Sequence, residues 1–365
     1  SHLRDKPSMW SHTHLDAPML VLLLLLCLFG LAVLYSASAQ DSGYVFRQAI
    51  RMGIGFLVMI FIAQLSPTLL ERWAPWIYSF GIVLLVCVLI FGVGAKGAQR
   101  WLALPGFRIQ PSEIIKVVLP LTVAFCLAGK PLPPTLKQCC IALALIALPT
   151  LLIMKQPDLG TSLVIASSGI FVLLFSGIKW RYIFIAIGGA AACLPLLWMS
   201  MKEYQKQRVM TFLDPESDPL GSGWNIIQSK TAIGSGGISG KGWLDGTQSQ
   251  LNFLPESHTD FIIAVLAEEQ GLIGVTCLIT LYLLIIARGL WMASHISDSF
   301  GRLVCGSFIL TFFVFIFVNI GMVSGILPVV GLPLPMMSYG GTSIVTLMMG
   351  FGVMMSVYTH RNIII

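Results

Sequence analysis

Residues 18–37 of the chain read PMLVLLLLLCLFGLAVLYSA, an unbroken run without a charged side chain. A helix needs about 20 apolar residues to cross the hydrocarbon core of a bilayer, and this run has that length. It is too long for the apolar core of a secretory signal peptide, and no convincing cleavage site follows it. The run therefore predicts a helix that stays in the membrane.

The whole chain has the same apolar character. Of its 365 residues, 56% are hydrophobic and only 10% are charged, and the mean hydropathy is +0.86. Soluble domains carry about a quarter charged residues, so a water-soluble fold does not fit. The sequence instead predicts an all-α polytopic membrane protein with about ten transmembrane helices. The predicted spans are residues 18–38, 46–65, 74–94, 112–129, 138–155, 160–177, 182–200, 260–287, 302–325 and 340–359.

The connections between these segments predict the topology. An even number of spans places both termini on one side, and the balance of Lys and Arg in the short loops favours the cytoplasmic side. The longest connection, residues 201–259, then lies outside the cytoplasm between the seventh and eighth helices. We expect residues 1–365 to form a single transmembrane domain that carries this loop, with a short helix near residues 223–231.

Positively charged residues gather on the predicted outer face. Snorkelling to lipid headgroups would explain any one of them. Their concentration on one face indicates instead a site for an anion, such as a lipid-linked diphosphate. The net charge of +6 does not indicate a nucleic-acid partner, because the basic residues form no dense stripe. The outward residues are Arg47, Arg51, Lys96, Arg100, Arg108, Lys116 and Lys155.

The sequence offers neither a disulfide framework nor a protein-bound metal site. The eight cysteines fall within or beside apolar runs, where cysteine behaves as a small hydrophobic residue. No Cys-x-x-Cys or His-Glu-x-x-His spacing occurs, and His258 has no nearby His or Cys. The glycine-rich stretch at residues 234–241 comes close to a phosphate-binding P-loop but lacks its spacing and its preceding strand. We expect this stretch to be a flexible lid or a substrate-facing loop.

Asp260 stands at the start of the eighth predicted helix, where two interpretations are open. Thr259 or Asp260 could simply cap the helix. Alternatively, Asp260 is a general base, since a carboxylate at the mouth of a helix is partly desolvated and yet accessible to a substrate.

A second polar cluster lies at the outer start of the fourth predicted helix. Ser112 is expected to cap that helix, and Glu113 and Lys116 are spaced to pair on one face. Such a pair near the bilayer is costly unless it is buried in protein or faces a polar cavity, so structural pairing and substrate contact are both open. Glu268 and Glu269 lie deeper in the eighth helix, where a buried polar contact, a proton path or a catalytic role would each fit.

Several longer motifs follow one another in a fixed order along nearly the whole chain. They are KGAQRW at 96–101, QPSE at 110–113, QPDLGT at 156–161, GKG at 240–242, FLPE at 253–256 running into HTDF at 258–261, EE at 268–269 and SYGG at 338–341. At these residues the chain resembles the SEDS proteins (shape, elongation, division and sporulation). The stretches GTQSQ at 246–250 and GLPLP at 331–335 resemble the elongation branch of that family rather than its division branch.

The resemblance implies an inverting peptidoglycan glycosyltransferase in the bacterial cytoplasmic membrane, with its active site on the outer face. Its substrate would be lipid II, an undecaprenyl-diphosphate-linked disaccharide-pentapeptide, and its partner a class B penicillin-binding protein that crosslinks the product. Asp260 matches the essential carboxylate of the family, for which we expect the role of general base. A divalent cation could accompany the diphosphate, although the sequence shows no carboxylate cage for one. The expected substrate-binding residues are Arg47, Lys96, Arg100, Arg108, Gln110, Glu113, Lys116, Lys155 and His258.

Two other functions are open from the sequence. A lipid flippase would also have many helices, intramembrane carboxylates and broken helices, but it should place its key charges near the midplane of the membrane rather than at the outer rim. A scaffold that only recruits the crosslinking enzyme would leave the outer polar cluster without a purpose.

Overall fold

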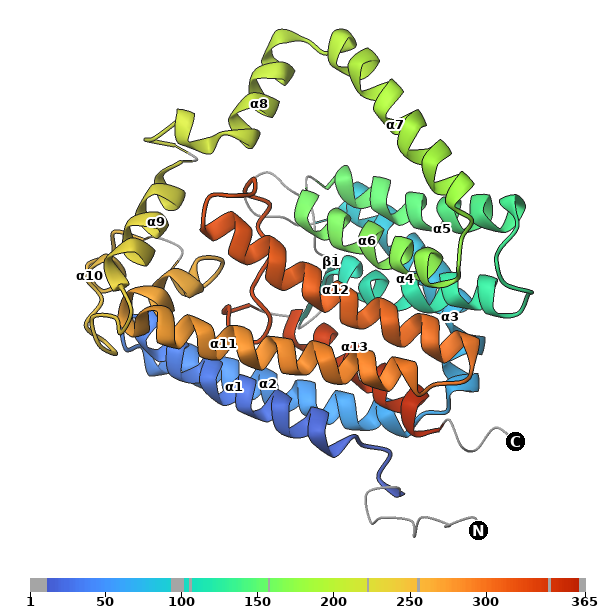
Figure 1. The fold of residues 1–365 in the computed structure, drawn as a ribbon, viewed down its shortest axis with the longest axis horizontal. Helices are drawn as coiled ribbons and strands as arrows, with labels where there is room; N and C mark the ends of the chain where they lie inside the picture. The colour runs from blue at the N-terminus through green and yellow to red at the C-terminus, as the bar shows by residue number, and fades with distance from the viewer. Residues whose placement is uncertain are drawn as a thin grey trace.

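The computed structural model describes residues 12–92, 102–104, 107–156, 158–221, 223–254, 257–340 and 343–360. Every predicted span coincides with an apolar helix, which confirms the predicted fold class (Figure 1). Within the described residues, eight of these helices are long and apolar enough to cross a membrane, and the other two, α6 and α13, have 17 residues each. The helices are α1 (Ala17–Ala37), α2 (Ser42–Gln64), α3 (Pro67–Phe91), α4 (Pro111–Ala128), α5 (Leu136–Met154), α6 (Leu159–Phe175), α7 (Trp180–Ser200), α11 (Ile262–Ser294), α12 (Ser299–Val323) and α13 (Ser343–Thr359).

The remaining elements lie in two connections. The long connection at 201–259 contains α8 (Glu203–Leu213), the 3₁₀ helix η2 (Pro215–Ser217), α9 (Trp224–Gly236) and α10 (Thr247–Gln250). Helix α9 is the short helix that the sequence predicts there. A small antiparallel hairpin, β1 (Leu102–Leu104) and β2 (Phe107–Ile109), precedes α4.

Polar capping residues fix where the helices begin. The carboxylate of Asp16 accepts a hydrogen bond from the main-chain N–H of Met19 at the start of α1, at 3.2 Å. The hydroxyl of Ser66 does the same for Leu69 in α3, also at 3.2 Å. Helix α3 therefore begins at Pro67 rather than at residue 74, because a hydropathy window passes over its polar first turns.

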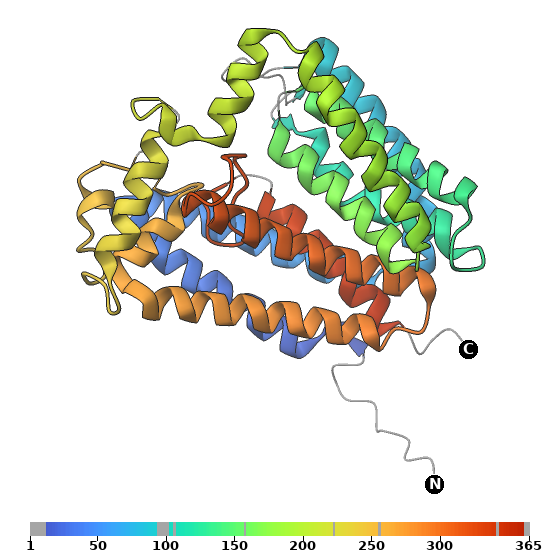
Figure 2. The ribbon, with the colours of Figure 1, turned by 45° about the horizontal axis from the view of Figure 1, so that its top comes forward.

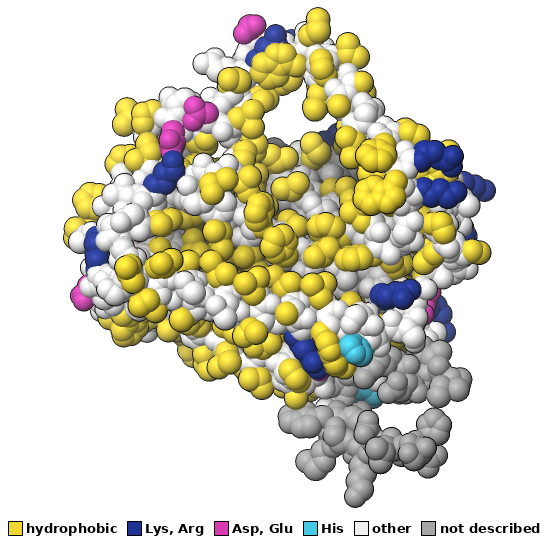
Figure 3. All heavy atoms as spheres, viewed as in Figure 1, with side chains coloured by type: hydrophobic (Ala, Val, Ile, Leu, Met, Phe, Trp, Pro, Cys, Tyr) yellow, Lys and Arg dark blue, Asp and Glu magenta, His cyan; other side chains and the backbone are white. Residues whose placement is uncertain are grey.

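The two ends of the bundle differ. The start of α1 and the end of α13 lie at one end, and α9 and α10 of the 201–259 connection lie at the other, as the predicted topology requires (Figures 1 and 2). An ion pair between Arg288 and Asp16, 2.5 Å apart, joins α11 to the start of α1. Charged side chains lie mainly toward the ends of the molecule, and hydrophobic side chains cover much of the face between them (Figure 3).

Helix α7 stands away from the rest of the bundle. Together with α8 it forms an arch beside the other helices, seen in both ribbon views (Figures 1 and 2). None of its residues, all of which the structure describes, is buried in the protein. Phe184 and Met199, for example, are 66% and 77% exposed. In a membrane, such side chains contact lipid rather than water.

The glycine-rich stretch is not a free loop, so the expectation of a flexible lid was wrong. Helix α11 is kinked at Gly271, where φ is +64°, and the main chain of residues 237–242 fills the kink. A Cβ atom at Gly240 or Gly271 would meet neighbouring backbone at 2.2 or 2.5 Å, so glycine allows this close approach. The hydrogen bonds run from the N–H of Lys241 to Glu268 O (3.0 Å), Gly242 to Glu269 O (2.8 Å), Leu272 to Gly237 O (2.9 Å) and Ile273 to Ile238 O (3.1 Å).

Candidate active site

Asp260 lies in the turn that leads into α11. The helix begins at Ile262, and its N-cap position is Phe261, with no side-chain cap. The interpretation of Thr259 or Asp260 as the N-cap is therefore wrong. Asp260 itself is partly exposed.

The backbone around Asp260 is held by donors from two other parts of the chain. Three consecutive carbonyls, those of residues 258–260, each accept a hydrogen bond. The donors are the main-chain N–H of Tyr339 (2.9 Å), the hydroxyl of Ser338 (2.7 Å) and the side-chain amide of Asn319 (2.9 Å), in that order. These bonds fix the direction in which the Asp260 side chain leaves the backbone.

Gly331 lies next to the Asp260 carboxyl group. Gly331 is exposed and has a φ of +73°, which is the left-handed region that glycine adopts readily. Among the described residues, a Cβ atom built on Gly331 would have one heavy atom of another residue within 4 Å, the Oδ2 atom of Asp260 at 3.8 Å. A larger residue at position 331 would therefore bring its side chain up to the carboxylate.

Two arginines of α2 and three aromatic rings form a cluster next to this turn, which we call the Tyr339 cluster. Arg47 donates through Nε to the hydroxyl of Tyr339 at 3.1 Å, and the guanidinium of Arg51 lies 4.9 Å from the centre of the Tyr339 ring. The ring of Tyr44 lies 4.9 Å from that of His258 and 4.8 Å from that of Tyr339. The structure thus places Arg47 in one cluster with His258, and His258 is two residues from Asp260 in the chain.

The two arginines change the chemistry of Tyr339. Burial alone would raise the pKa of its hydroxyl, but hydrogen bonds from Arg47 and Arg51 and their positive charges lower it, and the net effect is a lowered pKa. The arginines therefore create a positive potential at this position, which favours an anion.

Glu113 and Lys116 form the predicted ion pair at the outer end of α4. Lys116 Nζ lies 2.8 Å from Glu113 Oε1, and the two side chains are 10% and 12% exposed. The other carboxylate oxygen of Glu113 accepts a hydrogen bond from Thr346 of α13 at 2.7 Å. Ser112 does not cap α4, because Gln110 occupies the N-cap position and the hydroxyl of Ser112 is buried without a partner among the described residues.

A short series of contacts links Lys116 to Asp260. Lys116 Nζ lies 5.7 Å from the centre of the Phe315 ring, over a cavity of about 40 Å³ with largely apolar walls. Phe315 packs with Leu332 in a small buried cluster. Leu332 follows Gly331, which borders the Asp260 carboxyl group. The ion pair and the candidate base therefore belong to one region of the protein.

The other predicted substrate-binding residues are Gln110, Arg108, Lys155, Lys96 and Arg100. Gln110 is partly buried, and its side chain makes no capping bond. Arg108 lies in β2 opposite Ala103, and the structure does not describe its side chain. Lys155 is exposed at the end of α5. The predictions for Lys96 and Arg100 fall outside the described residues.

Sequence reasoning missed several residues of this region. Thr346, Asn319 and the Tyr339 ring contact predicted site residues, but each lies far from its partner in the sequence. Tyr339 belongs to the SYGG motif, which is the signal that could have singled it out. Nothing in the spacing around Asn319 or Thr346 points to a partner.

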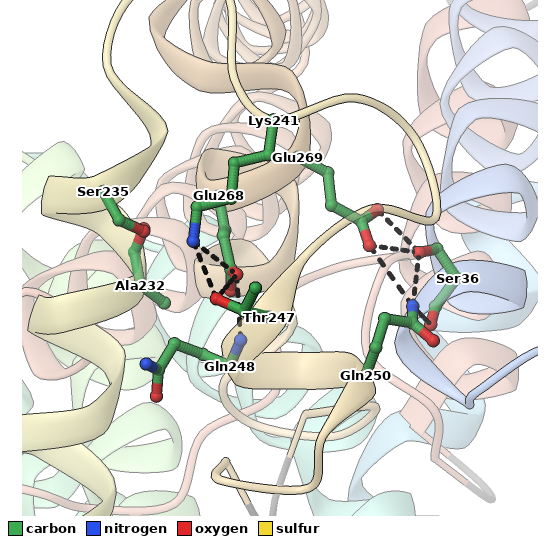
Figure 4. A network of polar contacts seen from close by, with 9 residues as sticks. All are labelled: Ser36, Ala232, Ser235, Lys241, Thr247, Gln248, Gln250, Glu268 and Glu269. Atoms are coloured by element: carbon green, nitrogen blue, oxygen red, sulfur yellow. Dashed lines mark hydrogen bonds and ion pairs between the residues drawn. The ribbon is translucent and has the colours of Figure 1, made fainter.

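Glu268 and Glu269 act as two anchors for the long connection (Figure 4). Glu268 is fully buried, and one of its oxygens accepts hydrogen bonds from Lys241 Nζ (3.2 Å), Thr247 Oγ1 (3.2 Å) and the main-chain N–H of Gln248 (2.9 Å). Glu269 is 2% exposed, and its carboxylate binds the hydroxyl of Ser36 in α1, at 2.5 and 2.6 Å, and the amide of Gln250 at 3.3 Å. Of the three roles open from the sequence, these contacts favour a buried polar contact.

We expect Glu269→Ala to lower the thermal stability of the protein. The substitution leaves the Ser36 hydroxyl without its acceptor in a buried site, and an unsatisfied buried polar group costs about 1–3 kcal/mol. The unfolding midpoint of the detergent-solubilised protein measures the effect. Glu203→Ala is the control, because Glu203 pairs with Lys206 at 3.9 Å and its side chain is 94% exposed. Equal midpoints for the two variants would contradict the anchoring role.

Among the residues that the structure describes, no group of three or more His, Cys, Asp or Glu side chains is placed to hold a metal ion. Binding of a divalent cation together with a diphosphate stays a prediction from the sequence.

Comparison with known proteins places the chain in a family. The FtsW/RodA/SpoVE family, described as "Cell cycle protein", matches residues 16–363. The chain is 55% identical over 361 residues to the peptidoglycan glycosyltransferase MrdB of Escherichia coli K12, which covers 99% of this chain and 98% of that protein.

Solved structures of other proteins support the same family assignment. A chain of a peptidoglycan synthase complex that coordinates polymerization and crosslinking matches with a TM-score of 0.84 and 33% identity, covering 95% of this chain and 98% of that one. The rod shape determining protein RodA of Thermus thermophilus matches with a TM-score of 0.72 and 28% identity, covering 95% and 97%. The chain therefore belongs to the FtsW/RodA/SpoVE family, the SEDS proteins.

Proposed function

We propose that the chain is a peptidoglycan glycosyltransferase that polymerises lipid II on the outer face of the bacterial inner membrane during cell elongation, with Asp260 as general base. The observation that carries the proposal is the position of Asp260. It is partly exposed on a turn whose carbonyls are held by hydrogen bonds, its carboxyl group lies next to Gly331, and Arg47 contacts Tyr339, whose main chain holds the same turn. The likeness to MrdB and RodA supports the reaction class and its place in cell elongation.

The proposed chemistry is a single displacement. The Asp260 carboxylate accepts the proton of a sugar hydroxyl on the acceptor lipid II. The hydroxyl oxygen forms a bond to the anomeric carbon of the terminal sugar of the growing chain, and the bond from that carbon to the diphosphate oxygen breaks. The diphosphate leaves with the electron pair, so the configuration at the anomeric carbon inverts. Asp260 then releases its proton to solvent.

The cations in this region would stabilise the departing diphosphate. Lys116 carries its charge in a largely buried position, where a fixed cation acts more strongly on developing negative charge than it would in water. Glu113 holds Lys116 in place through the ion pair, and Thr346 holds Glu113 in turn through a hydrogen bond. Arg47 is exposed beside the Tyr339 cluster and would meet a phosphate nearer the surface.

The chain is a multi-pass inner-membrane protein, and we propose that a class B penicillin-binding protein is its partner. The solved relative in a peptidoglycan synthase complex supports a partner that crosslinks the glycan as it forms. Lipid II and a transpeptidase would then meet at the outer end of the helices, where the 201–259 connection lies.

The flippase alternative has less support. A transporter needs charged groups that move a substrate or a proton at the depth of the membrane midplane. The buried carboxylates of Glu268 and Glu269 are engaged in anchoring the long connection. The charged residues of the candidate site lie instead at the ends of helices, as Lys116 does in α4 and Arg47 in α2.

Purified full-length protein in complex with its penicillin-binding partner tests the proposal. With labelled lipid II in detergent or liposomes, we expect glycan chains that resolve as a ladder on a gel. The transpeptidase activity of the partner is blocked with a β-lactam so that only polymerisation is read. Absence of chains from the wild-type complex, together with transfer of lipid II across vesicle membranes, would support the flippase instead.

A further inference from the structure

Asn319 is a polar side chain in the apolar helix α12. It lies one turn before the end of the helix and is 0% exposed. A buried amide is costly unless its hydrogen-bonding groups are used, so its contacts indicate what it does.

The side-chain amide of Asn319 bridges two segments that are far apart in the sequence. Nδ2 donates to the main-chain carbonyl of Asp260 at 2.9 Å and to that of Leu332 at 2.7 Å. The first carbonyl belongs to the residue proposed as the base. The second belongs to the residue after Gly331, which lies next to the Asp260 carboxyl group. Asn319 therefore sets the separation of the Asp260 turn and the segment that begins at Gly331.

The orientation of the amide is fixed by its donors. Turning it over would point Oδ1 at two carbonyl oxygens, and an amide oxygen cannot donate to either. In the observed orientation Oδ1 is buried and has no partner among the described residues. The side chain thus forgoes an acceptor bond and makes two donor bonds. A side chain that holds two backbone carbonyls in place needs two donors, whereas a side chain that only fills space between helices needs none.

We propose that Asn319 is a positioning residue for the glycosyl transfer, which holds the Asp260 turn against the 331–335 segment so that the carboxylate faces the reacting hydroxyl. The inference rests on the proposed function of Asp260. Asn319 contacts main chain on both sides, so it acts on the geometry of the base and not on the substrate itself. An error of about 1 Å in the placement of a catalytic group can cost on the order of 10²-fold in rate.

Asn319→Leu tests the proposal, because leucine has the same branching at Cγ as asparagine and no donors. Ser307→Ala is the matched control: Ser307 lies in the same helix, is 0% exposed, and donates its hydroxyl to the main-chain carbonyl of Ser168 at 2.7 Å, away from the site. The kcat and the KM for lipid II are measured for the full-length protein in complex with its penicillin-binding partner, alongside the unfolding midpoint. We expect Asn319→Leu to lower kcat by about 10²-fold with KM within about twofold of wild type, and Ser307→Ala to change neither.

The outcomes separate the possibilities. A kcat for Asn319→Leu no lower than that of Ser307→Ala overturns the proposal, and so does a raised KM with an unchanged kcat, which would mean direct contact with the substrate. Should Asn319→Leu fail to fold, Asn319→Gln, which keeps the amide on a longer side chain, undergoes the same comparison and is expected to show a smaller loss of kcat. A wild-type complex that makes no glycan defeats the proposed function, whereas active wild type with equally active variants defeats only the role of Asn319.

Discussion

Asp260→Asn is expected to lower the rate of polymerisation by about 10²–10⁴-fold, the usual contribution of a general base. Asparagine has nearly the same size and shape as aspartate but cannot take up a proton from the attacking hydroxyl. The hydrogen bonds that hold the turn involve the main-chain carbonyls of residues 258–260, so they survive the substitution. Lipid II consumption and glycan formation by the purified complex measure the rate, and the unfolding midpoint measures folding.

Asp218→Asn provides the control for this variant. Asp218 is an exposed aspartate in the long connection, so its substitution removes the same charge from the outer side of the protein without touching the turn. We expect the control to polymerise at the wild-type rate. If Asp260→Asn makes glycan as fast as Asp218→Asn, another group removes the proton and the proposed mechanism is wrong.

The sequence was sufficient for the helices because membrane solvation leaves few choices. A chain segment in hydrocarbon must satisfy its own backbone hydrogen bonds, so long apolar runs such as residues 18–37 become helices. Hydropathy could not find the start of α3, since a capped polar turn such as that after Ser66 costs little at the interface. It also could not predict that α7 stands apart from the bundle, because lipid-facing and protein-facing apolar residues look alike.

The candidate site was predictable only where its residues are close in the sequence. The pair Glu113 and Lys116 follows from helical spacing, and the structure contains it. The brace from Asn319 to Asp260 joins residues on different helices, and no local pattern encodes such a contact. For Asp260 the residues alone leave a cap and a general base open, and the resemblance to a family favours the general base.

The glycine-rich stretch shows how composition can mislead. Glycine is typical both of flexible loops and of backbone that must approach other backbone closely. Here Gly240 and Gly271 serve the second purpose, and the anchors at Glu268 and Glu269 hold the adjoining segment down. The long connection is therefore fixed to α11 within a few turns of Asp260, which makes its position part of the site's architecture.

Lys116→Gln is expected to lower the rate of polymerisation by about 10²–10³-fold, the effect of removing one fixed group that stabilises charge in a transition state. The negative charge on the departing diphosphate grows as the bond to the anomeric carbon breaks, so kcat should fall more than binding of lipid II weakens. Steady-state kinetics of the purified complex over a range of lipid II concentrations separate the two. The variant leaves Glu113 without its cation in a site where the carboxylate is only 12% exposed, so some loss of stability accompanies it.

Two further variants separate the catalytic effect from that loss of stability. A double variant that combines Glu113→Gln with Lys116→Gln removes both charges. Its unfolding midpoint should therefore recover, while its rate of polymerisation stays low. Lys206→Gln is the matched surface control, because Lys206 also pairs with a glutamate three residues earlier, at 3.9 Å, but next to a side chain that is 94% exposed. Surface ion pairs contribute little to stability, so we expect Lys206→Gln to polymerise lipid II at the wild-type rate. If the double variant regains both stability and rate, Lys116 serves only to neutralise Glu113, and the diphosphate must be stabilised by other cations.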